Sequence, residues 1–382
     1  MKKYFFIFLI LIIIGGGAFL YLNKDLFIEK KEKKEPMEEI KSNDLFGKYY
    51  TSANAKLKKM SLEEKIGQLF LVRYDSNLAS TYINKYHVGG LLLFAKDFDG
   101  FNKSTMKEHI DNLQKQSTYP LAIAADEEGG FVTRISRYEA FRDSKFKSPK
   151  SYYSEGGYEL LEQIEREKAK LLLSIGVNFN LAPVADISTN QDDFIYIRSF
   201  GEDAASTSEF ISNMVSYAND ENISSCLKHF PGYGNNEDTH TGIAIDNRDY
   251  KNFEENDYLP FISGIDQKVP AILVSHNVVK CMDSDYPASL SSKVITDELR
   301  DKLHFSGIVV TDDLDMDAVK EYADGGNAAT LAINAGADML ITSDLPSMFQ
   351  ELLDGVKNKK IEESTIDKAV LRILAWKEAY QI

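Results

Sequence analysis

The sequence predicts an α/β fold, a (β/α)8 barrel of the TIM type, from three observations. Short apolar segments alternate with amphipathic helical segments from about residue 61 to the C-terminus. Eight segments have the composition of strands, and eight parallel strands close a barrel of this type. Polar and charged residues gather where these segments end, at the rim where such barrels carry their active sites.

The eight candidate strands are short and apolar, as expected for strands buried on both faces of a parallel sheet. Helical patterns between them predict right-handed connections that bring consecutive strands side by side. The candidates are residues 70–72, 90–94, 121–125, 179–183, 225–229, 271–275, 307–311 and 338–342.

The helical segments carry recognisable signals. Ser61 and Glu64 form a capping box, so we expect the first helix of the folded domain to begin there. Residues 160–175 have one apolar face, interrupted by Lys168, whose aliphatic stem could lie along that face. A last helix over residues 365–380 would close the ring. We therefore expect a single catalytic domain.

The N-terminal segment predicts a membrane anchor. Residues 4–22 are apolar and uncharged, and their number suits a spanning helix. We expect a cytoplasmic tip at 1–3, a signal anchor at 4–22, a charged tether at 23–52 and the barrel at 53–382. This places the protein in the cell membrane as a single-pass protein with the domain outside. The alternatives are secretion after signal cleavage and, for the tether, a short helix lying on the domain.

The charge composition of the chain bears on the kind of molecule that it binds. The chain has 44 basic and 59 acidic residues and a formal net charge of -15. Nucleic acid is therefore not an expected partner, because phosphate binding needs basic patches. The two cysteines, Cys226 and Cys281, cannot build a disulfide framework. We expect Cys226, in an apolar stretch, to be a buried free thiol.

Five predicted strands end in polar clusters, which is more than ordinary loop starts would give. We expect them to converge at one end of the barrel. The clusters are Asp126-Glu127-Glu128, Asp186, Lys228-His229, Ser275-His276 and Asp312-Asp313.

The cluster that begins at Lys228-His229 runs into a turn rich in proline and glycine. Lys228 and His229 offer hydrogen-bond donors to a hydroxylated ligand. Downstream, Asp238 and His240 lie two residues apart, so that the carboxylate could orient the imidazole and make a proton shuttle. A paired acid and base at neutral pH is the expected chemistry of this loop.

Two other clusters carry carboxylates. The strand ending at Asp312-Asp313 delivers a pair suited to a nucleophile or to stabilising an oxocarbenium ion. Asp315 and Asp317 are expected to be solvated or to cap the next helix. Asp126 could accept hydrogen bonds from sugar hydroxyls. Two arginines, Arg134 and Arg198, could donate to the sugar or form buried ion pairs that shape the loops.

These motifs resemble the β-N-acetylglucosaminidases of glycoside hydrolase family 3, over about residues 61–376. The specific matches are Lys-His-Phe-Pro-Gly-x-Gly at 228–234, with Asp-x-His downstream, and Asp-Asp-Leu-x-Met at 312–316. Supporting matches are Asp-x-Glu-Gly-Gly at 126–130, Leu-Ala-Pro-Val-Ala-Asp at 181–186 and Pro-Ala-Ser-Leu-Ser at 287–291.

The resemblance implies a retaining exo-glycosidase that removes terminal β-linked N-acetylglucosamine, with cell-wall fragments as expected substrates and no cofactor or metal. It implies that Asp312 is the nucleophile and that His240, oriented by Asp238, is the general acid/base. It also implies sugar contacts from Asp126, Arg134, Arg198, Lys228, His229 and Met316.

Two positions depart from the family pattern. Tyr233 stands where the family commonly has histidine, and Phe131 stands where it commonly has arginine. Both could offer a stacking surface to a second sugar. The alternatives in the family are a β-glucosidase and a glycosyl phosphorylase, and outside enzymes a catalytically silent sugar-binding protein. A metal-dependent amidohydrolase would need His-x-His on the first strand, where this chain has Val72-Arg73-Tyr74.

Overall fold

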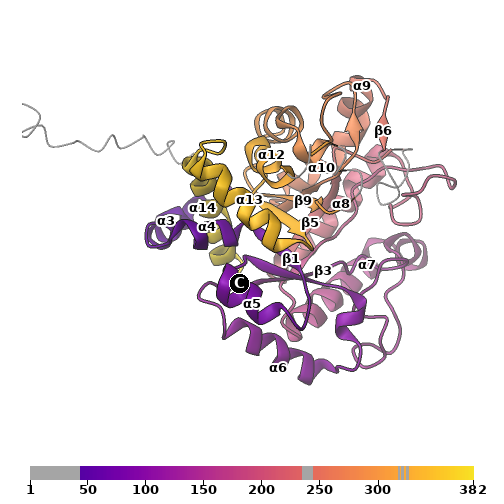
Figure 1. Ribbon diagram of the computed structural model, residues 1–382. Coiled ribbons are helices and arrows are strands. Elements are labelled where there is room, and N and C mark those ends of the chain that lie inside the picture. Colours follow the sequence, from indigo (N-terminus) through magenta and orange to yellow (C-terminus); the bar gives the residue numbers. More distant parts are fainter. Residues whose placement is uncertain (1–43, 235–243, 317–318, 320–321, 324–326) are drawn as a thin grey trace, which may run out of the picture. The chain divides into compact units, whose positions relative to one another are not determined.

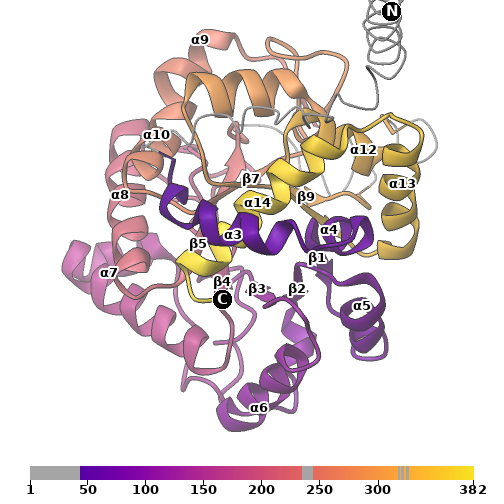
Figure 2. The ribbon, with the colours of Figure 1, turned by 90° about the vertical axis from the view of Figure 1, so that its left-hand side faces the viewer.

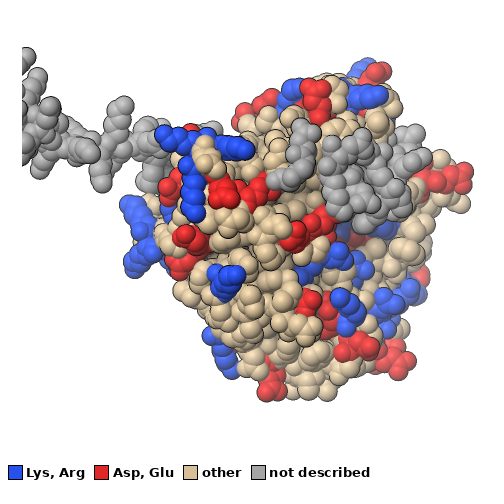
Figure 3. Space-filling model, in the orientation of Figure 1, with Lys and Arg blue, Asp and Glu red and all other residues tan. Residues whose placement is uncertain are grey.

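The computed structural model describes residues 44–234, 244–316, 319, 322–323 and 327–382. One compact folded unit spans Asp44–Ile382. In it a ring of helices surrounds a barrel of strands, with the chain following the barrel once around (Figure 1). Acidic and basic side chains are interspersed on the face shown in Figure 3.

The barrel is closed and all its strand pairs are parallel. Closure comes from β1, which pairs with β2 on one side, Leu71 opposite Gly90, and with β10 on the other, Leu71 opposite Ile341. All eight strand predictions are confirmed, in the order β1-β10-β9-β7-β5-β4-β3-β2 around the barrel. The strands are β1 (Phe70–Arg73), β2 (Gly90–Leu93), β3 (Ala122–Ala125), β4 (Phe179–Asn180), β5 (Ser224–Phe230), β7 (Ala271–Val274), β9 (Ile308–Asp313) and β10 (Met339–Thr342).

The helices pack their apolar faces on the outside of the strands. The long ones are α5 (Ala79–Tyr86), α6 (Lys103–Gln114), α7 (Pro149–Ser174), α8 (Ala204–Asp220), α10 (Tyr258–Asp266), η5 (Lys293–Lys302), α12 (Ala328–Ala335) and α13 (Leu345–Lys357). Short helical turns are η1 (Gly47–Tyr49), η2 (Ala95–Phe98), α9 (Tyr250–Asn252), η3 (Phe253–Asp257) and η4 (Ala288–Leu290). A separate parallel pair, β6 (Ile245–Asp246) and β8 (Val278–Val279), was not predicted.

Three helices cover the end of the barrel where the strands begin, α3 (Tyr50–Leu57), α4 (Leu62–Gln68) and α14 (Glu363–Ala379) (Figure 2). The predicted capping box opens α4: Glu64 N–H donates to Ser61 Oγ at 3.2 Å and Ser61 N–H to Glu64 Oε2 at 2.8 Å. The predicted last helix is α14. It is anchored where Trp376 Nε1 donates to Ser224 Oγ at 2.8 Å, at the start of β5.

The predicted tether is too long at its C-terminal end. The folded unit begins at Asp44, so the predicted boundary at residue 53 lies inside α3. The reason is burial: Tyr50, Ala53 and Leu57 share one face of α3, and Phe46, just before η1, is only 1% exposed. The alternative of a short helix lying on the domain therefore holds for the segment that follows Asp44.

Other N-terminal predictions fall outside the described residues. These are the tip at 1–3, the anchor at 4–22 and the tether up to residue 43. In the part of the chain that is described, none of the helices has the length and apolar character needed to cross a membrane.

Three smaller expectations are confirmed. Cys226 is buried and Cys281 exposed, and both are free thiols. Lys168, which interrupts the apolar face of α7, is only 4% exposed. Its ammonium reaches Glu165 Oε2 at 2.6 Å while its stem lies within the helix packing.

Candidate active site

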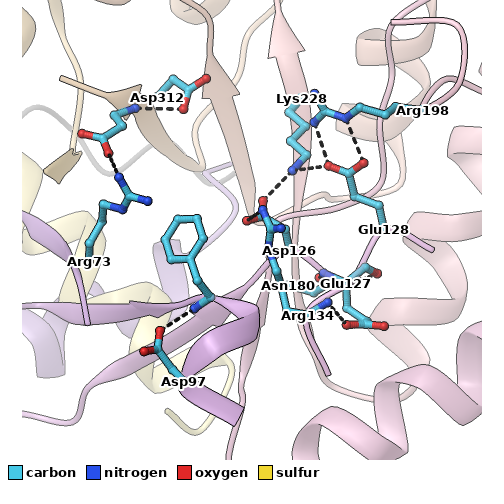
Figure 4. Close-up of polar contacts among 12 residues, drawn as sticks. Arg73, Asp97, Asp126, Glu127, Glu128, Arg134, Asn180, Arg198, Lys228 and Asp312 are labelled. Carbon is cyan, nitrogen blue, oxygen red and sulfur yellow. Dashed lines mark hydrogen bonds and ion pairs between the residues drawn. The ribbon is translucent and has the colours of Figure 1, made fainter. Parts of the chain in front are cut away.

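The predicted polar clusters do converge at one rim of the barrel. Asp126 follows β3, Asp186 follows β4, and Lys228 and His229 lie near the end of β5. Asp312 is the penultimate residue of β9, on the other side of the opening (Figure 4). Because all strands are parallel, these residues share the C-terminal rim, where loops and strand ends can surround a ligand.

Lys228 links two carboxylates. Its Nζ lies 2.7 Å from Asp126 Oδ1 and 2.7 Å from Glu128 Oε1. On the outer side of this pair, Arg134 Nη2 donates to Asp126 Oδ2 at 3.2 Å (Figure 4). Two predicted sugar ligands, Asp126 and Lys228, are therefore in direct contact, and Lys228 is 2% exposed.

Arg198 forms a two-pronged ion pair with Glu128. Arg198 Nη2 donates to Glu128 Oε1 at 2.8 Å and Arg198 Nε to Oε2 at 3.1 Å. The same Nη2 lies 3.2 Å from His229 Nε2. The structural alternative left open by the sequence, a buried ion pair, thus applies to Arg198, and the pair also places Arg198 beside His229.

The protonation of His229 follows from its two neighbours. A guanidinium only donates, so His229 Nε2 must accept from Arg198. The proton then lies on Nδ1, which donates to Asp186 Oδ2 at 2.7 Å. Asp186 also accepts the backbone N–H of Tyr233, at 2.7 Å, and so holds the ring and the following turn together.

Charge balance keeps this network ionised. Burial alone would raise the pKa of Asp126, but Lys228 and Arg134 outweigh it and hold that pKa well below its usual range. The same opposition, burial against Lys228 and Arg198, lowers the pKa of Glu128 to about 2. Burial would lower the pKa of Lys228, yet Asp126 and Glu128 raise it. The site therefore presents fixed charges at neutral pH.

Glu127 fastens the loop that carries Arg134. It is fully buried, and its Oε2 accepts Arg134 N–H at 2.8 Å and Ile135 N–H at 2.7 Å. Its own N–H donates to Asn180 Oδ1 at 3.0 Å (Figure 4). Of the predicted acidic cluster, one carboxylate thus holds the backbone and the other two face the cations.

Hydrogen bonds within β9, and one from His276 in the loop after β7, hold Asp312 and its neighbours in place. The N–H of Asp313 donates to Asp312 Oδ1 at 2.8 Å. His276 Nε2 lies 2.9 Å from the carbonyl oxygen of Asp313, so Nε2 carries the proton and Nδ1 accepts from Ser289 Oγ at 2.6 Å. The predicted ligand Met316 follows in the turn, where its N–H donates to Asp313 O at 3.1 Å.

Two expectations around the site need correction. Asp315 is not simply solvated: among the described residues its Oδ2 accepts from Thr342, Ser343 and Asp344, and so ties the loop to the end of β10. Tyr233 is 2% exposed and meets the His229 ring edge-on at 5.2 Å. It is therefore no stacking surface. Phe131, in contrast, is 73% exposed.

The predicted acid/base residues Asp238 and His240 lie outside the described residues. Among the described residues of this rim, Glu127, Glu128, Asp186 and His276 were given no role by the sequence. Each stood in a polar cluster at a predicted strand end, which was the available signal. Most of their partners are distant in sequence, so their roles could be read only in three dimensions.

Comparisons with known proteins agree with this architecture. The description "Glycosyl hydrolase family 3 N terminal domain" belongs to the family model that matches residues 61–376. A β-hexosaminidase of Nitrosomonas eutropha is 31% identical over 293 residues, 74% of this chain and 81% of that protein. The β-hexosaminidase LpqI of Mycobacterium tuberculosis is 27% identical over 334 residues, 83% of each chain.

Solved structures give the same result. A family 3 β-N-acetylglucosaminidase from a Paenibacillus species superimposes with a TM-score of 0.79 at 28% identity, over 84% of this chain and 63% of that one. A β-N-acetylhexosaminidase from Beutenbergia cavernae gives 0.74 at 26% identity, over 84% and 99%. The resemblance seen in the sequence is confirmed: the chain belongs to glycosyl hydrolase family 3.

Proposed function

We propose that the protein is a retaining exo-β-N-acetylglucosaminidase that releases terminal, non-reducing β-linked N-acetylglucosamine, with peptidoglycan fragments as its substrates. The observation that carries the proposal is the placement of Asp312 across the rim from the charged group of Asp126, Lys228 and Arg198 (Figure 4). The names of the relatives, β-hexosaminidases and a β-N-acetylglucosaminidase, support the sugar.

The charged group suits a hydroxylated ring. Asp126 and Glu128 accept hydrogen bonds, while Lys228, Arg134 and Arg198 donate them, so adjacent hydroxyls can each find a partner. Because the ion pairs already fix these side chains, little ordering is left for substrate binding. Such an arrangement fits a single sugar unit held in one orientation.

The chemistry then proceeds by double displacement. An oxygen of Asp312 bonds to the anomeric carbon as the bond to the leaving oxygen breaks, and that oxygen takes a proton from His240. Water next gives a proton to His240 while its oxygen bonds to the anomeric carbon and releases Asp312. Two inversions yield net retention. Asp238 orients His240 in this scheme.

Asp312→Ala tests the assignment. Turnover of p-nitrophenyl β-N-acetylglucosaminide should fall by about 10³-fold or more, because removing a nucleophile disables the whole pathway. Binding of N-acetylglucosamine, measured by calorimetry, should persist. Proton NMR of the wild-type reaction should show the β-anomer first.

Three results would contradict the proposal. Unchanged turnover in Asp312→Ala would show that Asp312 is not the nucleophile. An α-anomer as the initial product would show that the enzyme inverts the configuration. Preference for the matched β-glucoside would make the protein a β-glucosidase. Release of N-acetylglucosamine from purified wall fragments tests the source of the substrate.

We also propose that the domain is tethered outside the cell membrane by residues 4–22. The uncharged apolar run behind Lys2 and Lys3 supports this. The full chain should sediment with membranes, resist extraction by high salt and be cleaved by protease added to spheroplasts. A chain that begins at Asp44 should stay in the soluble fraction. Full-length protein released into the medium without residues 1–22 would instead indicate a cleaved signal.

A further inference from the structure

Arg73 reaches from one side of the rim to the strand that carries Asp312. It ends β1, and its Nη1 lies 3.3 Å from Asp313 Oδ2 at the end of β9. In the barrel, β10 separates β1 from β9, so the side chain spans an intervening strand. Figure 4 shows Arg73 directed toward the strand end that bears Asp312.

An aromatic ring holds Arg73 in this position. The guanidinium carbon of Arg73 lies 4.3 Å from the ring centroid of Phe94, and the backbone N–H of Phe94 donates to Asp97 Oδ2 at 2.8 Å. The guanidinium of Arg134 lies over the same ring at 5.1 Å. Stacking limits the freedom of a long side chain, so the Arg73–Asp313 contact costs less entropy than an isolated surface pair.

Asp313 passes this restraint on to Asp312. Its side chain accepts from Arg73 at Oδ2 and from the N–H of Asp315 at Oδ1, at 3.1 Å. Its carbonyl oxygen is held by His276. With the side chain and the carbonyl fixed, the N–H of Asp313 is aimed at Asp312 Oδ1, 2.8 Å away.

Electrostatics point the same way. Asp312, Asp313 and Asp315 place three carboxylates within four residues of β9 and its turn. Burial raises the pKa of Asp313, neighbouring carboxylates add to the rise, and Arg73 opposes them. In the described part of the chain, the ion pair of Asp313 is with Arg73. Without that cation, the like charges would push the Asp312–Asp313 turn apart.

We propose that Arg73 is a positioning residue for Asp312, acting through Asp313. It pins the Asp313 carboxylate so that the Asp313 amide holds the Asp312 carboxylate in the orientation needed for attack. Arg73 itself makes no bond in the reaction. The inference rests on the proposed role of Asp312 as nucleophile, and it adds a residue from β1, a strand to which no role has been assigned.

A double-mutant cycle on the full-length protein tests the coupling, with Arg73→Met, Asp313→Asn and the double variant. Each single change should lower kcat for p-nitrophenyl β-N-acetylglucosaminide by about 10-fold or more and change KM by less than about twofold, because the nucleophile is misoriented while the sugar contacts remain. The double variant should be no slower than the slower single variant. Arg73→Lys, which keeps the charge, should recover part of the loss.

Arg142→Met is the matched control. Arg142 also stacks on a phenylalanine, Phe146 at 4.3 Å, and pairs with a carboxylate at 2.8 Å, but that carboxylate is Glu167 of α7 and not a neighbour of Asp312. It should leave kcat unchanged, and thermal unfolding should show whether both arginine variants are folded at the assay temperature.

The outcomes separate the two proposals. If Asp312→Ala is inactive and Arg73→Met keeps its wild-type kcat, Arg73 has no positioning role. Multiplicative losses in the double variant, or equal losses of kcat in Arg142→Met, would also overturn it. Full turnover in Asp312→Ala would instead overturn the proposed nucleophile.

Discussion

Lys228 and Lys377 are equally buried, each 2% exposed, but they have opposite electrostatic environments. Lys228 Nζ lies 2.7 Å from each of two carboxylates, whereas Lys377 Nζ donates to an amide oxygen, Gln68 Oε1, at 2.8 Å. Burial favours the neutral amine in both. At Lys228 the carboxylates outweigh burial and raise the pKa; at Lys377 burial, aided by Lys56, lowers the pKa to about 7.

The two lysines lie at opposite ends of the barrel. Lys228 is near the end of β5, at the rim with Asp312, and Lys377 is in α14, which covers the end where the strands begin (Figure 2). One end therefore keeps its ammonium charged, and the other tolerates a neutral one. The difference shows that burial alone does not mark a functional group; the partners of the group do.

At the covered end of the barrel, charged side chains pair with one another inside the packing between strands and helices. Asp338, at the start of β10, is fully buried between Arg300 at 2.6 Å and Arg372 at 2.8 Å. The side chains of Arg300 and Arg372 are 15% and 25% exposed, much as that of Arg134 at the rim is 24% exposed, but the side chain of Asp126 is 13% exposed whereas that of Asp338 is fully buried. Both ends pair their charges, but of the carboxylates Asp126 and Asp338 only Asp126, at the rim, is left within reach of a ligand.

The largest effect that follows from this contrast is on activity. Lys228→Met should lower kcat/KM for p-nitrophenyl β-N-acetylglucosaminide by about 10³-fold, because it removes the proposed sugar donor and leaves Asp126 and Glu128 without their shared cation. Lys377→Met, an identical change at an equally buried lysine, should change kcat/KM by less than about twofold. Equal losses in the two variants would mean that the rim has no special role for Lys228.

Much of the fold could be predicted because the signals are local. The apolar segments of the eight strands and the capping box at Ser61 depend only on neighbouring residues. A local signal was also present in Phe46, Tyr50, Ala53 and Leu57, spaced as one helical face. It was hidden by the Lys/Glu-rich composition around it, so the start of the folded unit was placed too late.

The site could be predicted only as a set of residues, without its pairings. Lys228 and Asp126 are 102 residues apart, and Arg198 and Glu128 are 70 apart. Nothing in the local sequence says which carboxylate an arginine will meet. Tyr233 illustrates the same limit: the sequence allowed it to offer a stacking surface to a second sugar, whereas Asp186 draws the turn that carries it inward against His229.

The pH dependence of stability tests the neutral state of Lys377, with a smaller expected effect than that of Lys228→Met on activity. Between about pH 7 and 10.5 the unfolded chain holds the Lys377 proton and the folded protein does not, so the free energy of unfolding should rise with pH. Below about pH 7 both states are protonated, and the folded protein bears the full cost of a buried charge.

Lys377→Met removes this titration. At pH 6 the free energy of unfolding of the variant should exceed that of the wild type by on the order of 2–4 kcal/mol, after the loss of the Gln68 hydrogen bond is counted. At pH 10.5 the two should differ little or not at all. Urea unfolding at both pH values measures the difference, with the exposed Lys103→Met as control. A difference between variant and wild type that does not depend on pH would show that Lys377 stays charged in the folded protein. Both ends of the barrel would then hold a buried ammonium ion, and the two lysines would differ in their partners but not in their charge.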